Sequence, residues 1–186
     1  KTLEPSDGHS YNVAIGHQSG KLMTTGVENN LFGALAGDSL TTGSYNVAFG
    51  KGALTNEDTG SRNVAIGSRA LNSLNYDGDG YNIAIGYDAG LNMSTGVQNT
   101  LIGGSAGNAL TTGGYNVAIG YNALSTEDAH GTNIAIGKSA LQNLNAGANA
   151  YNVAVGFEAG LSVTTGVQNT LIGGLSGDAL TTGARN

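Results

Sequence analysis

The sequence contains no cysteine and no tryptophan, and it has only one proline, Pro5, and three phenylalanines. Without cysteine the chain can form neither disulfides nor thiolate metal sites, and this absence does not fix its compartment. Because tryptophan is absent and phenylalanine is scarce, any hydrophobic core must be thin and aliphatic.

Charge and long apolar runs are also scarce. Charged residues make up 11% of the chain and the net charge is −6, which disfavours nucleic acid as a partner. No apolar run approaches the roughly 18 residues that a membrane helix needs, and no signal peptide is visible. We therefore expect no membrane insertion in this segment.

Glycine, by contrast, is abundant, with 32 residues in the chain. It does not occupy every third position, which excludes a collagen triple helix. Disorder is disfavoured too, because 39% of the residues are hydrophobic and they recur in register.

The dominant pattern is an asparagine that returns every 17 residues, with a spacing of 19 at every fourth step. A larger unit of 70 residues results. The asparagines of the complete units are Asn12, Asn29, Asn46, Asn63, Asn82, Asn99, Asn116, Asn133, Asn152 and Asn169, and Asn186 opens another unit. Such short periods are typical of solenoids. We predict a lead-in over residues 1–10 and one β-solenoid domain over 11–186, as a segment of a longer fibre.

Each unit, called a coil here, is numbered from its asparagine as position zero. Position four is always glycine, as in Asn12-Val13-Ala14-Ile15-Gly16, where it ends a short extended run and permits a turn. Position three is always large and apolar, so we expect it to form the core. Position two is alanine or leucine, and we expect this opposite face to pack against other copies. Helices are excluded by the glycine content and the period.

The rest of each coil predicts a second short strand or bend, and a Thr-Gly pair precedes many of the asparagines. The two-residue insertions, within 75–80 and 145–150, must bulge in a turn because a stacked strand cannot absorb them. Asp77-Gly78-Asp79 resembles the start of a calcium loop but lacks the later glutamate, so we interpret it as a solvated turn. The recurring pairs Glu57-Asp58 and Glu127-Asp128 are expected to be exposed.

Two columns of like residues are candidate functional features. Stacking would let the asparagine amides form a structural ladder along the fibre. Tyrosine precedes every second asparagine, and this stripe consists of Tyr11, Tyr45, Tyr81, Tyr115 and Tyr151. The stripe is interpreted either as rings that pack over small neighbours or as an aromatic face for sugars and surfaces.

Catalysis and metal binding find no support in the pattern. His9, His17 and His130 share no column, and the serines belong to the repeats. We therefore expect no enzyme activity, no cofactor and no metal site.

The coils resemble the head repeats of YadA-type trimeric autotransporter adhesins and the repeats of phage tail fibres. The resemblance runs from about Tyr11 to Asn186, through motifs such as Asn46-Val47-Ala48-Phe49-Gly50 and Asn116-Val117-Ala118-Ile119-Gly120. It implies a left-handed parallel β-roll, a homotrimer displayed outside a cell or on a virion, and an attachment function. The 17/19 spacing and Leu31, Leu101 and Leu171 at position two depart from the adhesin heads.

We therefore predict a structural or adhesive fibre segment whose partners are its own copies and a cell-surface glycan or protein. The alternative is an ice-binding solenoid that uses columns of threonine, such as Thr25, Thr42 and Thr112. That column is interrupted at Gly78, Ala129 and Ala148. A spacer that binds nothing is a further possibility.

Overall fold

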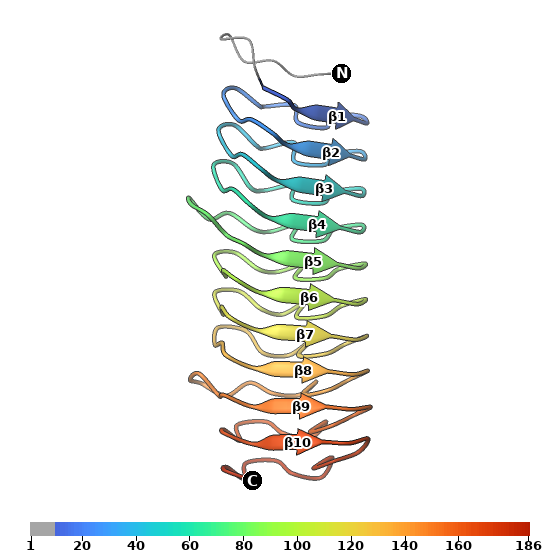
Figure 1. Cartoon of the computed structure of the whole chain (residues 1–186), viewed down its shortest axis with the longest axis vertical. Helices are drawn as coiled ribbons and strands as arrows, with labels where there is room; N and C mark the ends of the chain where they lie inside the picture. Colours follow the sequence, from blue (N-terminus) through green and yellow to red (C-terminus); the bar gives the residue numbers. More distant parts are fainter. Residues whose placement is uncertain (1–9) are drawn as a thin grey trace.

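The computed structural model describes residues 10–186, which form one parallel β-solenoid (Figure 1). Each coil contributes one three-residue strand, and the ten strands stack in chain order into a single sheet. The strands are β1 (Val13–Ile15), β2 (Asn30–Phe32), β3 (Val47–Phe49), β4 (Val64–Ile66), β5 (Ile83–Ile85), β6 (Thr100–Ile102), β7 (Val117–Ile119), β8 (Ile134–Ile136), β9 (Val153–Val155) and β10 (Thr170–Ile172). Apart from Ser10, the expected lead-in lies outside the described residues.

The predicted all-β solenoid is confirmed, and residues 10–186 contain no helix, hence none able to span a membrane. Every strand pairs in parallel with the next, position for position, as in Ala14 opposite Leu31. The register survives the longer fourth coil, where Ala65 lies opposite Ala84. The two insertions project as loops at the left of the stack in Figure 1, before β5 and before β9. Like residues therefore form columns along the whole rod.

The expected orientation of the strands was wrong. Position two, not position three, points into the solenoid: Ala48, Ala84 and Leu101 are fully buried. Position three faces outward, and Ile15 and Phe49 are 54% and 55% exposed. Because both positions are apolar, alternation alone does not tell which face is the interior. The alanine and leucine face that was expected to meet other copies is thus the core of one chain.

For the rest of each coil the sequence predicted a second short strand or a bend, and the structure shows turns and bends, with no second strand in residues 10–186. The glycine at position four does end the strand in a turn, with φ between 121° and 144°. At Gly120 a Cβ would lie 2.4 Å from the carbonyl oxygen of Gly137, one coil further on. The close stacking of the turns therefore requires glycine here.

The core explains why four coils make one larger repeat. Leu101 at position two fills the space beside Gly107 of its own coil and Gly90 of the preceding coil. A Cβ on either glycine would lie 2.8–2.9 Å from the Leu101 side chain. In the next coil, position two is the smaller Ala118, and position eight becomes the buried Leu124. Side-chain volume is thus exchanged between two columns over four coils.

The glutamates of the two acidic pairs are buried, contrary to the expectation. Glu57 and Glu127 are fully buried at position eleven, where the other coils carry apolar side chains. The Glu57 carboxylate accepts hydrogen bonds from the N–H of Gly60 (2.7 Å) and of Tyr76 (3.2 Å) in the inserted loop. Glu127 likewise accepts from the N–H of His130 and of Ala146. Each carboxylate thus precedes an insertion and bonds to it.

The displaced loop explains why a carboxylate is needed at this place. In the first coil the N–H groups of Thr24, Thr25 and Gly26 all donate to the carbonyl of Thr41, one coil on. In the third coil, Gly60 N–H bonds to Glu57 instead, because the insertion moves the next coil's main chain away. The carboxylate supplies the acceptor, so the backbone donor stays satisfied.

Candidate interaction surfaces

The outward face of the sheet is an apolar surface along the full length of the rod. It is formed by positions one and three of all ten strands, and it carries no charged residue. Asn30, Thr100 and Thr170 are its polar members. Phe32 and Phe49 stack on each other with their ring centroids 5.6 Å apart. A continuous exposed apolar face of this length is a typical interaction site.

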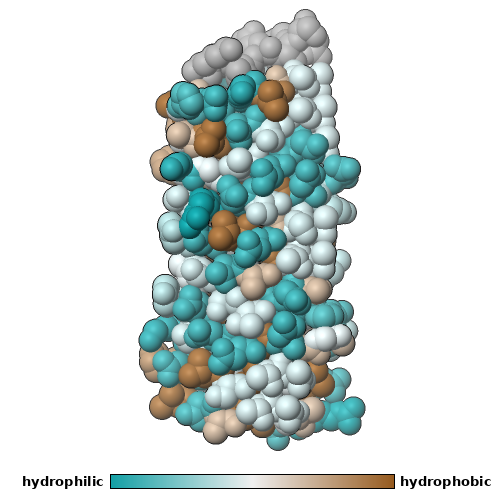
Figure 2. Space-filling view, turned by 180° about the vertical axis from the view of Figure 1, so that it is seen from behind, coloured by the Kyte–Doolittle hydropathy of each residue, from teal (hydrophilic) through white to brown (hydrophobic). Residues whose placement is uncertain are grey.

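The opposite face of the rod has a different character. Figure 2 shows that hydrophilic and neutral residues dominate there and that apolar residues form scattered patches. This face is built from the turns of each coil, as the Figure 1 view from the other side indicates. The two faces therefore differ in chemistry, and the strand face is the better candidate for a protein partner.

The asparagine column forms a buried hydrogen-bonded ladder. In a typical step, Asn99 Oδ1 accepts from the backbone N–H of Asn116 (2.9 Å), and Asn99 Nδ2 donates to the carbonyl of Gly113 (2.9 Å). Corresponding side chain–to–backbone bonds join Asn12, Asn29, Asn46, Asn63, Asn82, Asn99, Asn116, Asn133, Asn152, Asn169 and Asn186. The ladder faces the interior, so its task is to hold the coils together.

The tyrosine stripe lies at the start of the strands and is exposed to solvent. Tyr11, Tyr45, Tyr81, Tyr115 and Tyr151 are between 45% and 71% exposed. The Arg62 guanidinium lies 5.0 Å from the ring centroid of Tyr45 and 5.8 Å from that of Tyr81, and it forms an ion pair with Asp79. Between Tyr115 and Tyr151 the shorter Thr132 takes this place. The tyrosines of the stripe therefore recur at every second coil, whereas the residue type between them varies.

A second exposed aromatic column was missed by the sequence analysis. It lies at position five, just after the strand, and includes Tyr87, Tyr121 and Phe157, which are 58%, 57% and 49% exposed. Arg69 lies over Tyr87 and Lys138 over Phe157, each about 5 Å from the ring centroid. The signal was present in the sequence, because these three aromatic residues lie six residues after Tyr81, Tyr115 and Tyr151.

The threonines divide into two adjacent columns. The Thr24, Thr41 and Thr111 hydroxyls donate to main-chain carbonyls one coil further on, at 2.9–3.1 Å. The neighbouring Thr25, Thr42 and Thr112 are exposed. Hydroxyls of the first column are thus occupied by bonds between coils.

Glu127, Asp128 and His130 place one potential metal ligand each within 4.8 Å of one another. Both carboxylate oxygens of Glu127, however, face backbone N–H groups, and His130 Nδ1 lies 3.3 Å from Glu127 Oε1. The corresponding residues of the previous large repeat are Glu57, Asp58 and Gly60, without a histidine. These contacts indicate that Glu127 anchors the inserted loop through hydrogen bonds, as Glu57 does in the previous large repeat.

Comparison with known proteins found no matching family model, no matching curated protein and no matching solved structure. The functional argument therefore depends on the surfaces described above.

Proposed function

We propose that this chain is a structural and adhesive segment of a homotrimeric fibre, displayed outside a cell or on a virion, that mediates attachment to a cell surface. The observation that carries the proposal is the apolar strand face, which runs the length of a straight rod and carries no charge. The resemblance of the coils to adhesin heads and tail-fibre repeats supplies the threefold symmetry and the attachment task.

The shape of the chain supports a mechanical role. Ten stacked coils rise by roughly 50 Å at about 4.8 Å per strand. Successive coils are joined by backbone hydrogen bonds and by the asparagine ladder. A rod of this kind sets a distance between two ends and offers the same surface at each level. These are the properties that a fibre needs and that a catalytic pocket does not.

The threonine geometry favours the fibre over the ice-binding alternative. A hydroxyl lattice for ice needs an unbroken exposed column, whereas the exposed column that includes Thr25, Thr42 and Thr112 is interrupted at Gly78, Ala129 and Ala148. The hydroxyls of the adjacent threonine column donate to neighbouring coils. Measuring thermal hysteresis of the purified chain tests this alternative directly. We expect none, and a hysteresis that rises with protein concentration would favour ice binding.

Light scattering of the purified chain tests the association. We expect a mass near three times the 18.5 kDa of one chain. The double variant Ile119→Lys/Ile136→Lys, which places charges on the strand face, should fall to the single-chain mass. Thr95→Lys/Thr112→Lys adds the same two charges at exposed turn positions outside the strand face and serves as the charge-matched control for a general effect. A wild-type mass near 18.5 kDa would refute the homotrimer.

Attachment is tested separately from association. The trimer is labelled and added to cells or to glycan-coated surfaces, and its binding is compared with that of a fibre of unrelated sequence. Saturable binding supports the adhesive role. A trimer that binds no surface would leave this segment as a spacer within a fibre and would contradict the adhesive part of the proposal.

A further inference from the structure

Two exposed columns flank the apolar strand face. We call the residues just before each asparagine the leading column and those at position five the trailing column. We propose that the leading column of one copy packs against the trailing column of the neighbouring copy, coil by coil at the same level. This inference rests on the self-association proposed above, and it specifies which edges of the rods meet.

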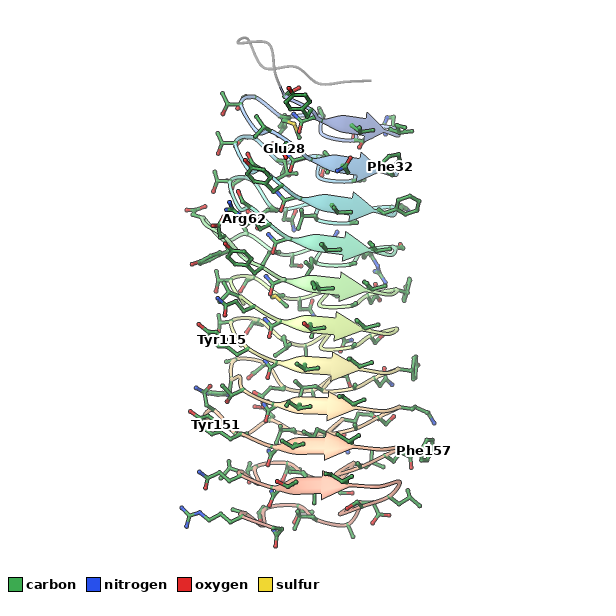
Figure 3. The ribbon with its side chains drawn as sticks, viewed as in Figure 1. Glu28, Phe32, Arg62, Tyr115, Tyr151 and Phe157 are labelled. Atoms are coloured by element: carbon green, nitrogen blue, oxygen red, sulfur yellow. The ribbon has the colours of Figure 1, made fainter. Side chains whose placement is uncertain are left out.

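The geometry places the two columns on opposite edges of the strand face. Figure 3 shows Tyr115 and Tyr151 at the start of the strands and Phe157 beyond their ends. The strand Val153–Val155 lies between Tyr151 and Phe157, which Figure 3 shows at opposite ends of the strands, so the two columns do not meet within one copy. In a closed ring around an axis along the stack, all strands run in the same sense. The start of one copy's strands then meets the end of the next copy's strands.

The large side chains of the trailing column recur mainly with the same two-coil period as the tyrosines of the leading column. Odd-numbered coils carry tyrosine in the leading column and an aromatic or basic residue in the trailing column. These pairs are Tyr11 with His17, Tyr45 with Lys51, Tyr81 with Tyr87, Tyr115 with Tyr121, and Tyr151 with Phe157. In four of the five even-numbered coils the trailing residue is small, namely Ala34, Ser68, Gly104 and Gly174, and Lys138 is the exception.

The chemistry of these pairs suits direct contact. Aromatic rings attract each other in edge-to-face or offset geometry, and a lysine ammonium is attracted to a tyrosine face. The chain already uses such contacts within one copy, since Arg62 lies between Tyr45 and Tyr81 and Lys138 lies over Phe157. The trailing Tyr87 and Tyr121 are more than half exposed in the single chain, which leaves their rings accessible to a neighbour.

The occupant of these columns is a second copy of this chain, because of the period. A partner that contacts every odd-numbered coil must repeat at about 9.6 Å, the rise of two coils, and keep this spacing for the length of the rod. Another copy has this period by construction. An irregular protein surface would meet one or two of these levels at most.

Cysteine cross-linking tests the pairing of the two columns, since the natural chain has no cysteine. The double variant Tyr115→Cys/Tyr121→Cys joins the two columns at one level. It is treated with a short bismaleimide and analysed on a denaturing gel. The single variants Tyr115→Cys and Tyr121→Cys test for contacts between like columns. The variant Tyr45→Cys/Tyr121→Cys places its cysteines four coils apart, about 19 Å along the stack, and serves as the matched control.

We expect covalent trimers from Tyr115→Cys/Tyr121→Cys and uncross-linked chains from both single variants and from the control. Light scattering of each reduced variant shows beforehand whether the oligomer is intact. An intact oligomer in which the double variant stays uncross-linked, or in which a single variant cross-links, would overturn the pairing of columns and leave self-association standing. A single-chain mass for the wild-type chain would overturn the self-association and this inference with it.

Discussion

At the scale of the residue, the asparagine at position zero is the most demanding position of the repeat. Its side chain is buried and connects two coils, because it accepts from one backbone N–H and donates to one backbone carbonyl. An apolar replacement would leave both backbone groups without a partner in the interior. No smaller or larger side chain reproduces this pair of bonds with the same reach.

We expect Asn99→Ala to lower the free energy of unfolding by about 2–3 kcal/mol, since the N–H of Asn116 and the carbonyl of Gly113 lose their partner. Denaturant unfolding followed by circular dichroism measures the change. The exposed Asn92 is the matched control, and Asn92→Ala should change stability by less than about 0.5 kcal/mol. Equal effects of the two substitutions would contradict the ladder as a source of stability.

The leading column carries backbone strain as well as side chains. Its residues all lie in the left-handed region, for example Gln98 with φ of 56° and Tyr115 with φ of 62°. In this region a residue with a Cβ is strained by roughly 1–2 kcal/mol, and glycine avoids this strain. Glycine also loses more backbone entropy on folding, which cancels part of that advantage. We expect Gln98→Gly to raise the free energy of unfolding by about 0.5–1 kcal/mol in the same assay. Gln142→Gly, at a position without positive φ, should lower it.

The sequence was enough to predict the solenoid fold, but it was not enough to predict which residues of each strand point into the core. The spacing of asparagine and glycine was enough for the solenoid, because every coil repeats the same turn. It did not show whether Ala14 or Ile15 points inward, since both are apolar. The informative signal is that position two varies together with position eight, as in Leu101 with Gly107 and Ala118 with Leu124. Such an exchange of volume is expected only between residues that share a core.

At the scale of the element, the four-coil unit is held together by this exchange of volume. Leu101→Ala should lower the free energy of unfolding by about 2–5 kcal/mol because it opens a cavity between two coils. Gly107→Leu alone should also destabilise, since Leu101 already occupies the space. The double variant re-creates the pairing of Ala118 and Leu124, so we expect it to be more stable than the sum of the two single changes predicts. Strict additivity would argue against the exchange.

The inserted loops could be located in the sequence, but their attachment could not. Glu57 and Glu127 appear next to other acidic and polar residues, which are typical of exposed turns. These glutamates are buried because each insertion leaves backbone N–H groups without a carbonyl acceptor from the next coil. The residues next to each glutamate in the sequence do not show that this acceptor is missing. The recurrence of glutamate before both insertions was the available signal.

Burial of Glu57 gives stability a distinct pH dependence. Burial raises the pKa of Glu57 above its ordinary value of 4.5, although the N–H groups of Gly60 and Tyr76 partly oppose the change. The folded chain therefore binds this proton more tightly than the unfolded chain does. The contribution of Glu57 to stability is fully present below pH 4.5 and is lost as the pH rises through the pKa of the folded state.

We therefore expect the natural chain to gain stability relative to Glu57→Gln as the pH falls from 8 through the raised pKa of the folded state towards 4.5. Comparing the two proteins at each pH removes the effect of the other carboxyl groups, which both share. Denaturant midpoints across this range give the difference directly. If the natural chain lost stability relative to Glu57→Gln on acidification, the hydrogen bonds to the carboxylate would outweigh its burial.

At the scale of the whole molecule, the chain is a rod with one apolar and one mainly polar side. The core of a single chain is narrow, because alanine and glycine occupy much of it. The outward residues of the strands supply the apolar surface that association would bury. Side-by-side assembly also keeps the ends of the stack available, as a longer fibre requires.

Small-angle X-ray scattering of the purified chain tests this account most directly, since one curve gives both the mass and the length of the particle. The account predicts a particle with the mass of three chains, three times 18.5 kDa, and the length of a single stack, roughly 50 Å for its ten coils. A particle with the mass of one chain, or one whose length grows in proportion to its mass, would contradict association through the strand face.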